Sequence, residues 1–168
     1  MTPKEFVAWI YPAAERLGEI SPLFVTAQAA LESGWGKSAI GNNLFGITKG
    51  SSWSGPVELV TTTEYFNRSD VSFRQPEKVL SVTDLGNGRY KYKVKRLFRQ
   101  YDTVDDCLRD YLAILNKPGY ADAWPYRLDP DKFVEKIQDA VGSRYATSPN
   151  YVKTMRQMFM SVKKYLDV

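Results

Sequence analysis

The sequence contains no histidine in its 168 residues. Ser-His-Asp and Cys-His nucleophilic catalysis both use an imidazole base, so neither is available in its usual form. Catalytic zinc sites built on histidine are also excluded, and the single cysteine, Cys107, cannot supply the missing ligands. We expect neither a metal nor a cofactor. If the chain is an enzyme, its carboxylates are left to perform the chemistry.

Cysteine and long apolar runs are equally scarce. One cysteine forms no internal disulfide, and Cys107 shares a helical stripe with Tyr111, which is typical of an unreactive packing residue. No run is long enough to cross a membrane. Lys4, Glu5 and Glu15 lie where a signal peptide would need an apolar block, so we expect no membrane insertion and no export signal.

Aromatic residues and positive charge are abundant. The chain has 11 Tyr, 8 Phe and 4 Trp, a net charge of +4 and a pI of about 9.1. Most of these rings belong to a core, but some are expected to line a groove where flat apolar faces suit sugar rings. The charge suits an anionic polymer such as peptidoglycan or nucleic acid, without deciding between them. The length predicts one domain, residues 1–168, which we expect to be a monomer.

Four predicted helix starts consist of a capping residue followed by proline. The capping residue supplies a side-chain oxygen at the N-cap, and the proline fixes a helical φ at the first helical position. The four sites are Thr2-Pro3, Ser21-Pro22, Asp129-Pro130 and Ser148-Pro149. A further helix is predicted to begin near Thr103. Glycines end three of the helices: Gly18, Gly34, and Gly142 just after Val141.

Between the second and third long helices the periodicity becomes alternating. Residues 57–66 read as a strand rich in Val, Thr and Tyr, and residues 79–84 and 90–98 flank a Gly-Asn-Gly hairpin turn. The sequence therefore predicts an α+β fold. A mainly helical body, about 1–43 and 102–168, would carry a β-lobe at about 44–101, with a cleft between them.

The basic stretch at 90–99 has two interpretations. Lys91, Lys93, Lys95, Arg96 and Arg99 alternate with aromatic residues, a pattern that could bind single-stranded nucleic acid. The alternative is the solvated face of a strand whose other face is aromatic and apolar, and we favour it. We therefore expect no nucleic-acid partner.

The residues richest in chemical information are AALESGWGKS at 29–38, followed by NNLFGI at 42–47. Glu32 lies seven, four and three residues after Val25, Gln28 and Ala29, so it is expected to extend the buried stripe of a helix. Burial and the negative end of the helix dipole both favour a protonated carboxyl group. A carboxyl that keeps its proton near neutral pH is suited to general acid catalysis, whereas an isolated helical glutamate more often has a structural role.

These segments resemble the catalytic signature of peptidoglycan N-acetylglucosaminidases of glycoside hydrolase family 73. The resemblance covers about residues 20–166 and implies a lysozyme-like α+β fold, with Glu32 as the acid and the peptidoglycan glycan strand as substrate. Trp35, Asn43 and Phe45 would line the sugar subsites. Tyr151, in a segment similar to the family's DPNY, would bind the N-acetyl group or tune Glu32; otherwise it is the first core residue of the last helix.

Hydrolysis of a sugar bond usually needs a second group opposite the acid. Glu64 lies in the strand segment Thr-Thr-Thr-Glu-Tyr, which looks like the family's segment carrying the second glutamate. Glu58, Asp70 and Asp84 compete for this role in the same lobe. About twenty residues separate Tyr65 from the hairpin, longer than the family's compact lobe.

The resemblance implies an endo-β-N-acetylglucosaminidase that cuts the β-1,4 bond between N-acetylglucosamine and N-acetylmuramic acid. The alternatives are a muramidase or lytic transglycosylase of the same fold, or a catalytically silent glycan-binding module. Action in the periplasm or on the cell wall without an export signal predicts delivery by phage lysis machinery or by an injection apparatus. An injected antibacterial toxin would be accompanied by a periplasmic immunity protein.

Overall fold

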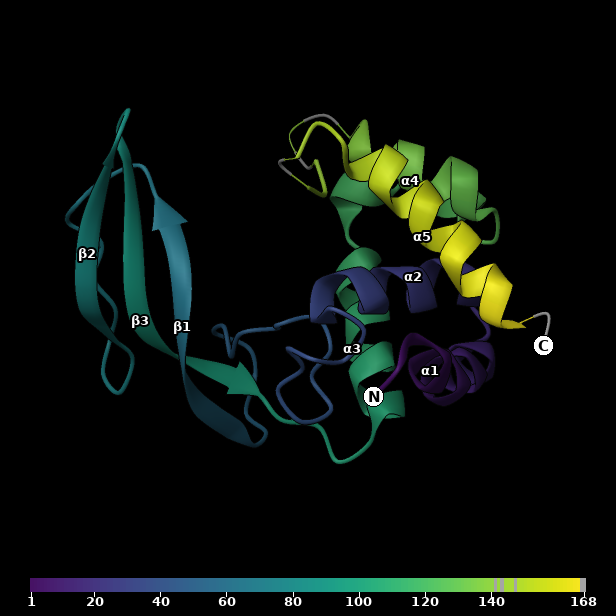
Figure 1. The fold of residues 1–168 in the computed structure, drawn as a ribbon, viewed down its shortest axis with the longest axis horizontal. Coiled ribbons are helices and arrows are strands. Elements are labelled where there is room, and N and C mark those ends of the chain that lie inside the picture. Colours follow the sequence, from purple (N-terminus) through teal and green to yellow (C-terminus); the bar gives the residue numbers. More distant parts are fainter. Residues whose placement is uncertain (141, 143, 147, 167–168) are drawn as a thin grey trace. The chain divides into compact units, whose positions relative to one another are not determined.

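The structure, a computed structural model, describes residues 1–140, 142, 144–146 and 148–166. It is α+β, as predicted, and divides into two compact units. A helical unit comprises Met1–Gly46 and Tyr101–Val168, and a β unit comprises Ile47–Gln100 (Figure 1).

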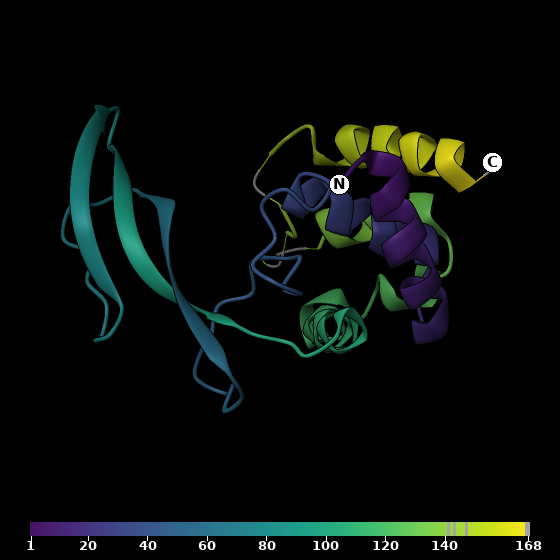
Figure 2. The ribbon, with the colours of Figure 1, turned by 60° about the horizontal axis from the view of Figure 1, so that its bottom comes forward.

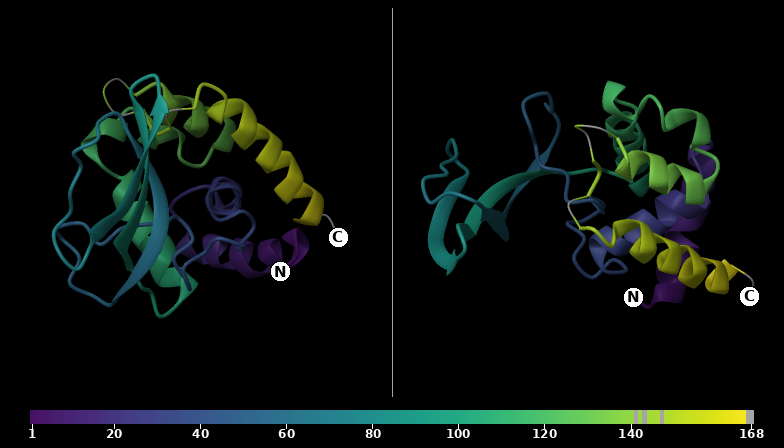
Figure 3. Two further views of the ribbon diagram at one scale, coloured as in Figure 1. Left: turned by 60° about the vertical axis from the view of Figure 1, so that its left-hand side comes forward. Right: turned by 90° about the horizontal axis from the view of Figure 1, so that it is seen from above.

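The helical unit is built around α2, which packs against three other helices, α1, α4 and α5. Its buried residues lie on all sides of the helix, as expected for a helix enclosed by others. α5 packs on both α1 and α2, as the views in Figures 2 and 3 show. The helices are α1 (Pro3–Leu17), α2 (Pro22–Ser33), α3 (Val104–Leu115), α4 (Pro130–Gln138) and α5 (Tyr151–Leu166).

Four helix starts follow the sequence prediction. Thr2 forms a capping box with Glu5, and the side chains of Ser21, Thr103 and Asp129 each accept a bond from the third residue after them. Side-chain caps of this kind typically contribute about 1 kcal/mol each. The four caps therefore help to place α1 to α4 where the sequence indicates.

The predicted start of the last helix is wrong. Ser148 does not cap a helix at Pro149, because its Oγ accepts the N–H of Asn150 two residues on and forms a local turn. α5 begins only at Tyr151. α4 ends at Gln138, earlier than predicted, and Val141 lies outside the described residues.

The β unit contains one antiparallel sheet in the order β1-β3-β2, with β3 in the centre. Its strands are β1 (Val57–Phe66), β2 (Lys78–Gly86) and β3 (Arg89–Arg99). Asn87 and Gly88 connect β2 to β3 with φ values of 55° and 72°. Positive φ at both positions is typical of a two-residue type I′ hairpin turn, which confirms the predicted hairpin.

The two faces of β3 differ in chemistry. Tyr92 and Val94 are fully buried, and the Tyr92 hydroxyl donates to the carbonyl of Arg68 and accepts the N–H of Val71. The segment before β2 therefore covers this face. Lys91 and Lys93, which alternate with them, are exposed. This confirms a solvated strand face for Lys91 and Lys93, whereas Arg96 lies on the same side as Tyr92 and Val94 and is partly buried.

Candidate active site

Glu32 lies in the last turn of α2. The helix ends after Ser33 because Gly34 takes the left-handed conformation, with φ 56°, and its N–H bonds to the carbonyl of Ala30. The side chain of Glu32 is exposed, so the expectation that it extends the buried stripe is wrong. Ala29, Ala30 and Ser33 of the same turn are buried, and Glu32 lies on the side of this turn that is open to solvent. Protein atoms around the carboxyl still remove part of its hydration, and this desolvation raises the pKa of Glu32.

A buried glutamine connects Glu32 to the last helix. Gln28 lies one turn before Glu32, and its Nε2 donates a 2.8 Å hydrogen bond to Glu32 Oε1. Its Oε1 accepts a hydrogen bond from the hydroxyl of Tyr151, which turns the amide nitrogen toward Glu32. The bond from Gln28 lowers the pKa of Glu32 and partly offsets the larger effect of desolvation. Three residues from two helices thus form one hydrogen-bonded chain.

Tyrosine rings surround this chain of bonds. The hydroxyls of Tyr111 and Tyr145 lie 2.7 Å apart, and the ring of Tyr145 lies 5.4 Å from that of Tyr151. Burial raises the pKa of all three phenols, and the negative charge of Glu32 adds to the effect. They therefore remain neutral hydroxyls near neutral pH. Around Glu32 they provide uncharged donors and apolar ring faces.

Trp35 follows in a tight left-handed turn. Gly34, Trp35 and Gly36 all have positive φ, at 56°, 59° and 90°, which is uncommon for a residue with a large side chain. The Trp35 ring packs edge-on against Phe6, at 5.9 Å, and against Tyr165, at 6.3 Å. These contacts hold the turn against α1 and α5. The role of Trp35 in a sugar subsite stays a prediction.

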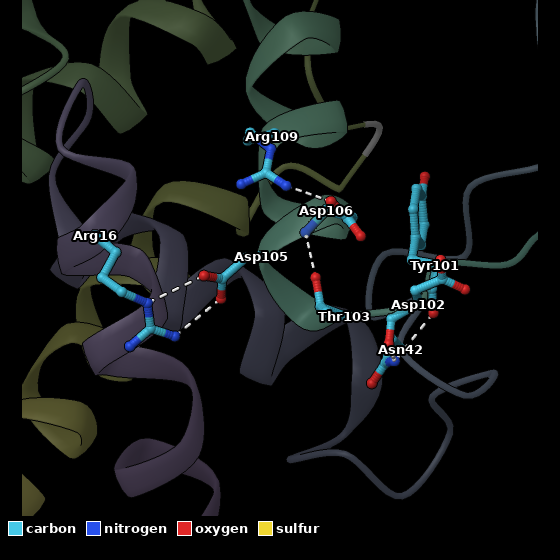
Figure 4. A network of polar contacts seen from close by, with 8 residues as sticks. All are labelled: Arg16, Asn42, Tyr101, Asp102, Thr103, Asp105, Asp106 and Arg109. Atoms are coloured by element: carbon cyan, nitrogen blue, oxygen red, sulfur yellow. Dashed lines mark hydrogen bonds and ion pairs between the residues drawn. The ribbon is translucent and has the colours of Figure 1, made fainter.

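The segment after this turn is anchored by Asn42. Its Nδ2 donates to the backbone oxygens of Tyr101, at 3.0 Å, and Asp102, at 3.1 Å (Figure 4). Asn43 is buried and its backbone pairs with that of Ile40. This anchoring fixes the path of the chain through the NNLFGI segment.

Phe45 is the residue of this segment that reaches the tyrosine rings. It is half-buried and stacks on Tyr111 with ring centres 3.8 Å apart and planes within 5°. Among the predicted site residues, the structure therefore brings Glu32, Phe45 and Tyr151 to one tyrosine-rich cluster. Asn43 supports the same segment from its buried side.

One ion pair links α3, which carries Tyr111, to α1. Arg16 on α1 binds Asp105 on α3 through both carboxylate oxygens, at 2.9 and 3.0 Å (Figure 4). The Arg16 guanidinium holds the pKa of Asp105 below its ordinary value. Cys107, on the same helix, is fully buried, and burial raises the pKa of its thiol to about 12, as expected for an unreactive packing residue.

Glu64 lies in the β unit, on β1. Both of its carboxylate oxygens accept bonds of 2.8 Å from Nη1 of Arg96. Arg96 also binds Glu77 through Nε at 2.6 Å, and its guanidinium lies over the ring of Phe73, 4.4 Å from the centroid. Glu64 therefore belongs to a partly buried network that ties the covering segment to the sheet. Its role as second catalytic group stays a prediction.

The three competing carboxylates have local contacts. Asp84 accepts the N–H of Gly86 at the end of β2, Asp70 forms an exposed ion pair with Arg68, and Glu58 accepts a long 3.4 Å bond from Gln100. Within the described residues, no group of three or more His, Cys, Asp or Glu side chains is arranged to hold a metal ion. No helix in the described part of the chain is both long and apolar enough to span a membrane.

Three residues of the site were not assigned a role from the sequence. Gln28 was placed only in the helical stripe, although a buried amide one turn before a candidate acid is a usable signal. Tyr111 was assigned to packing, on the stripe of α3. Tyr145 had no sequence signal, because its hydroxyl meets Tyr111 only through the fold.

Comparison with known proteins identifies the family. Residues 8–164 match the glucosaminidase family model, described as mannosyl-glycoprotein endo-beta-N-acetylglucosaminidase. The peptidoglycan hydrolase FlgJ of Pseudomonas aeruginosa is 32% identical over 176 residues, which cover 98% of this chain and 38% of the relative. The chain thus spans about two-fifths of the length of that curated relative.

Solved structures agree with this match. A C-terminally truncated glycoside hydrolase domain of FlgJ from Salmonella typhimurium is 32% identical, with a TM-score of 0.71 over 97% of this chain and 99% of that one. A peptidoglycan hydrolase mutant from Sphingomonas sp. A1 is 28% identical, with a TM-score of 0.69 over 98% of each chain. The resemblance to glycoside hydrolase family 73 is confirmed, and the chain belongs to the glucosaminidase family.

Proposed function

We propose that this chain hydrolyses the β-1,4 bond between N-acetylglucosamine and N-acetylmuramic acid in peptidoglycan. The observation that supports this most directly is the carboxyl group of Glu32, which is exposed at the end of α2, has a raised pKa and is oriented by Gln28. A general acid must be accessible to its substrate and keep its proton near the working pH. Relatives named peptidoglycan hydrolases support the choice of substrate.

In the proposed reaction, Glu32 gives its proton to the glycosidic oxygen as the bond to the sugar carbon breaks. Positive charge then develops on the ring of N-acetylglucosamine. Either Glu64 activates a water molecule to attack that carbon, or the substrate's own acetamido oxygen attacks while Glu64 supports the charge. In either role Glu64 would act from its contact with Arg96, which donates to both of its carboxylate oxygens.

The remaining site residues are proposed to act in two ways. Phe45 and Trp35 offer ring faces to the sugars, and the stack of Phe45 on Tyr111 keeps the first ring in place. Asn43 is too deeply buried for a large contact with substrate, so we propose that it orders the segment carrying Phe45. Tyr151 uses its hydroxyl on Gln28, which favours tuning of Glu32 over contact with the N-acetyl group.

Purified peptidoglycan sacculi provide the first test. The chain is expected to reduce the turbidity of a sacculus suspension and to release new reducing ends. Binding to sacculi without any release would instead support the silent glycan-binding alternative. The proposed site of action is the periplasm or cell wall. Delivery by phage lysis machinery or an injection apparatus, and an immunity protein in the latter case, stay predictions.

A further inference from the structure

The sheet of the β unit separates its charges by face. Lys91, Lys93 and Lys95 alternate along β3 and so project from one side, about 6.8 Å apart in succession. We call the side formed by these three residues and Lys78 the lysine face. In the register of the sheet, Lys78 on β2 lies directly opposite Lys95.

No acidic residue opposes these lysines across the strands. On β1, Lys91, Lys93 and Lys95 pair with Tyr65, Thr63 and Thr61. On β2, they pair with Thr83, Ser81 and Lys78. Directly paired residues share a face of the sheet, so every cross-strand neighbour of these lysines is neutral or basic.

The acids of the sheet lie on the other side. Glu58, Glu64 and Asp84 pair with Phe98, Tyr92 and Tyr90, the residues of β3 that alternate with the lysines. Among the described residues, none of the four lysines of the lysine face forms an ion pair. Like charges directly opposite each other, as at Lys78 and Lys95, destabilise a sheet. A bound anion would remove that repulsion.

The arrangement also discriminates between anionic polymers. Single-stranded nucleic acid is bound through basic side chains together with aromatic rings on which bases stack. Here Tyr90, Tyr92 and Phe98 are on the face opposite the lysines, and Tyr65 on the lysine face has Arg89 over its ring. The lysine face therefore provides charge without a row of stacking rings.

From this separation of charge we infer that the lysine face is a docking surface for the carboxylates of peptidoglycan stem peptides. This inference rests on the proposed function, because it takes the glycan strand and its attached peptides as the partner. A row of lysines, exposed at Lys78, Lys91 and Lys93 and half-buried at Lys95, suits an array of carboxylates that belongs to a polymer, since each such pair is weak and several act together. The surface would hold the chain on the wall independently of catalysis.

The test is cosedimentation of the full chain with purified sacculi at 4 °C, comparing wild type with the triple variant K91Q/K93Q/K95Q. The matched control is K4Q/K163Q/K164Q, which removes the same charge from exposed lysines of the helical unit. We expect the triple variant to need about 10-fold more sacculi for half-maximal binding, and the control to bind like wild type. A K91R/K93R/K95R variant should retain binding. Thermal unfolding of each variant checks that the sheet is intact.

Sacculi whose carboxylates have been converted to amides by carbodiimide coupling identify the anion. Wild type should bind them as weakly as the triple variant binds untreated sacculi, and binding should weaken between about 50 and 300 mM NaCl because salt screens exposed charges. Equal binding of wild type and triple variant to untreated sacculi would overturn the inference. The inference would also be overturned if the triple variant lost binding to an oligothymidine probe but kept binding to sacculi. That result would indicate a nucleic-acid surface.

Failure of this inference is distinguishable from failure of the proposed function. A chain that hydrolyses sacculi while the triple variant binds normally contradicts only the docking surface. A chain that binds through the lysine face but releases no reducing ends contradicts only the hydrolase.

Discussion

At the scale of single residues, Glu32 is set apart by its surroundings. Its carboxyl group is open to solvent on one side. The nearby hydroxyls of Tyr111, Tyr145 and Tyr151 are neutral and place no positive charge beside it. Desolvation therefore dominates and favours the protonated form. The position at the end of a helix fixes where the carboxyl group lies, and the surrounding protein atoms raise its pKa so that it can donate a proton.

Glu32→Gln is expected to lower turnover of sacculi by about 10²–10⁴-fold, because the amide has the same shape but no acidic proton to give. Gln28 can still donate to the new side-chain oxygen, so the thermal midpoint should stay close to that of wild type. Reducing-end release and thermal unfolding measure the two effects. Glu15→Gln, an exposed change on α1, is the control. Near-normal turnover of folded Glu32→Gln would exclude Glu32 as the acid.

Gln28→Met should shift the pH dependence of turnover. The Gln28 hydrogen bond lowers the pKa of Glu32, so its loss should raise that pKa further. A general acid loses activity as pH rises through its pKa; the alkaline limb of the profile for kcat is therefore expected to move to higher pH. The maximum rate should fall, since Glu32 is no longer oriented. A limb that stays in place, or moves to lower pH, contradicts this assignment.

Tyr151→Phe is the companion to that variant. It removes the hydroxyl that orients the Gln28 amide but leaves Gln28 available to donate to Glu32. A smaller shift of the alkaline limb than in Gln28→Met is expected. Burial of an unsatisfied Gln28 oxygen should cost about 1–3 kcal/mol of stability, which denaturant unfolding measures.

At the scale of elements, local patterns in the sequence predict most of the fold. The bounds of β1 are those predicted, and Thr2, Ser21, Thr103 and Asp129 cap helices as expected, because caps and alternation depend on near neighbours. The start of α5 was missed because the Ser148 hydroxyl can serve either a helix or a local turn.

The candidate site is less accessible to such reasoning. The contact of Tyr151 with Gln28 joins residues 123 positions apart, and the contact of Arg96 with Glu64 joins residues 32 apart. Contacts between residues so far apart produce no periodic pattern in the sequence from which they could be predicted. The motif around Glu32 indicates the candidate acid, whereas its exposure depends on which side of the last turn of α2 the rest of the fold leaves open.

The Arg96 network on the sheet gives a paired test of Glu64. Glu64→Gln is expected to lower kcat with little change in KM, since its charge matters mainly when the sugar ring is positive. Glu77→Gln breaks a contact with the same arginine and serves as the matched variant. It should lower stability by about 1–2 kcal/mol with a much smaller effect on kcat. Equal losses of kcat in both would assign Glu64 a structural role, and a harmless Glu64→Gln would direct attention to Asp70 or Asp84.

At the scale of the whole molecule, the chain has two compact units with different chemistry. The helical unit holds the candidate acid and its tyrosines, and the β unit holds Glu64 and the lysine face. The proposed place of action, the periplasm or cell wall, is supported by the family match and by relatives named peptidoglycan hydrolases.

Placement of the chain relative to the wall is testable in a Gram-negative host. Expression in the cytoplasm should be tolerated, because the proposed substrate lies outside the inner membrane. The same chain fused to an export signal should lyse the cells, and its Glu32→Gln form should not. Culture density and cell shape report the outcome. Toxicity confined to the cytoplasm would contradict a wall substrate and favour a nucleic-acid target.

The central proposal is that Glu32 drives cleavage on the reducing side of N-acetylglucosamine. Mass spectrometry of borohydride-reduced products, from sacculi treated with wild type or Glu32→Gln, tests it most directly. The proposed mechanism predicts reduced N-acetylglucosamine at the new ends with wild type and almost none with Glu32→Gln. New ends carrying reduced or anhydro N-acetylmuramic acid, or equal products from both proteins, would contradict it.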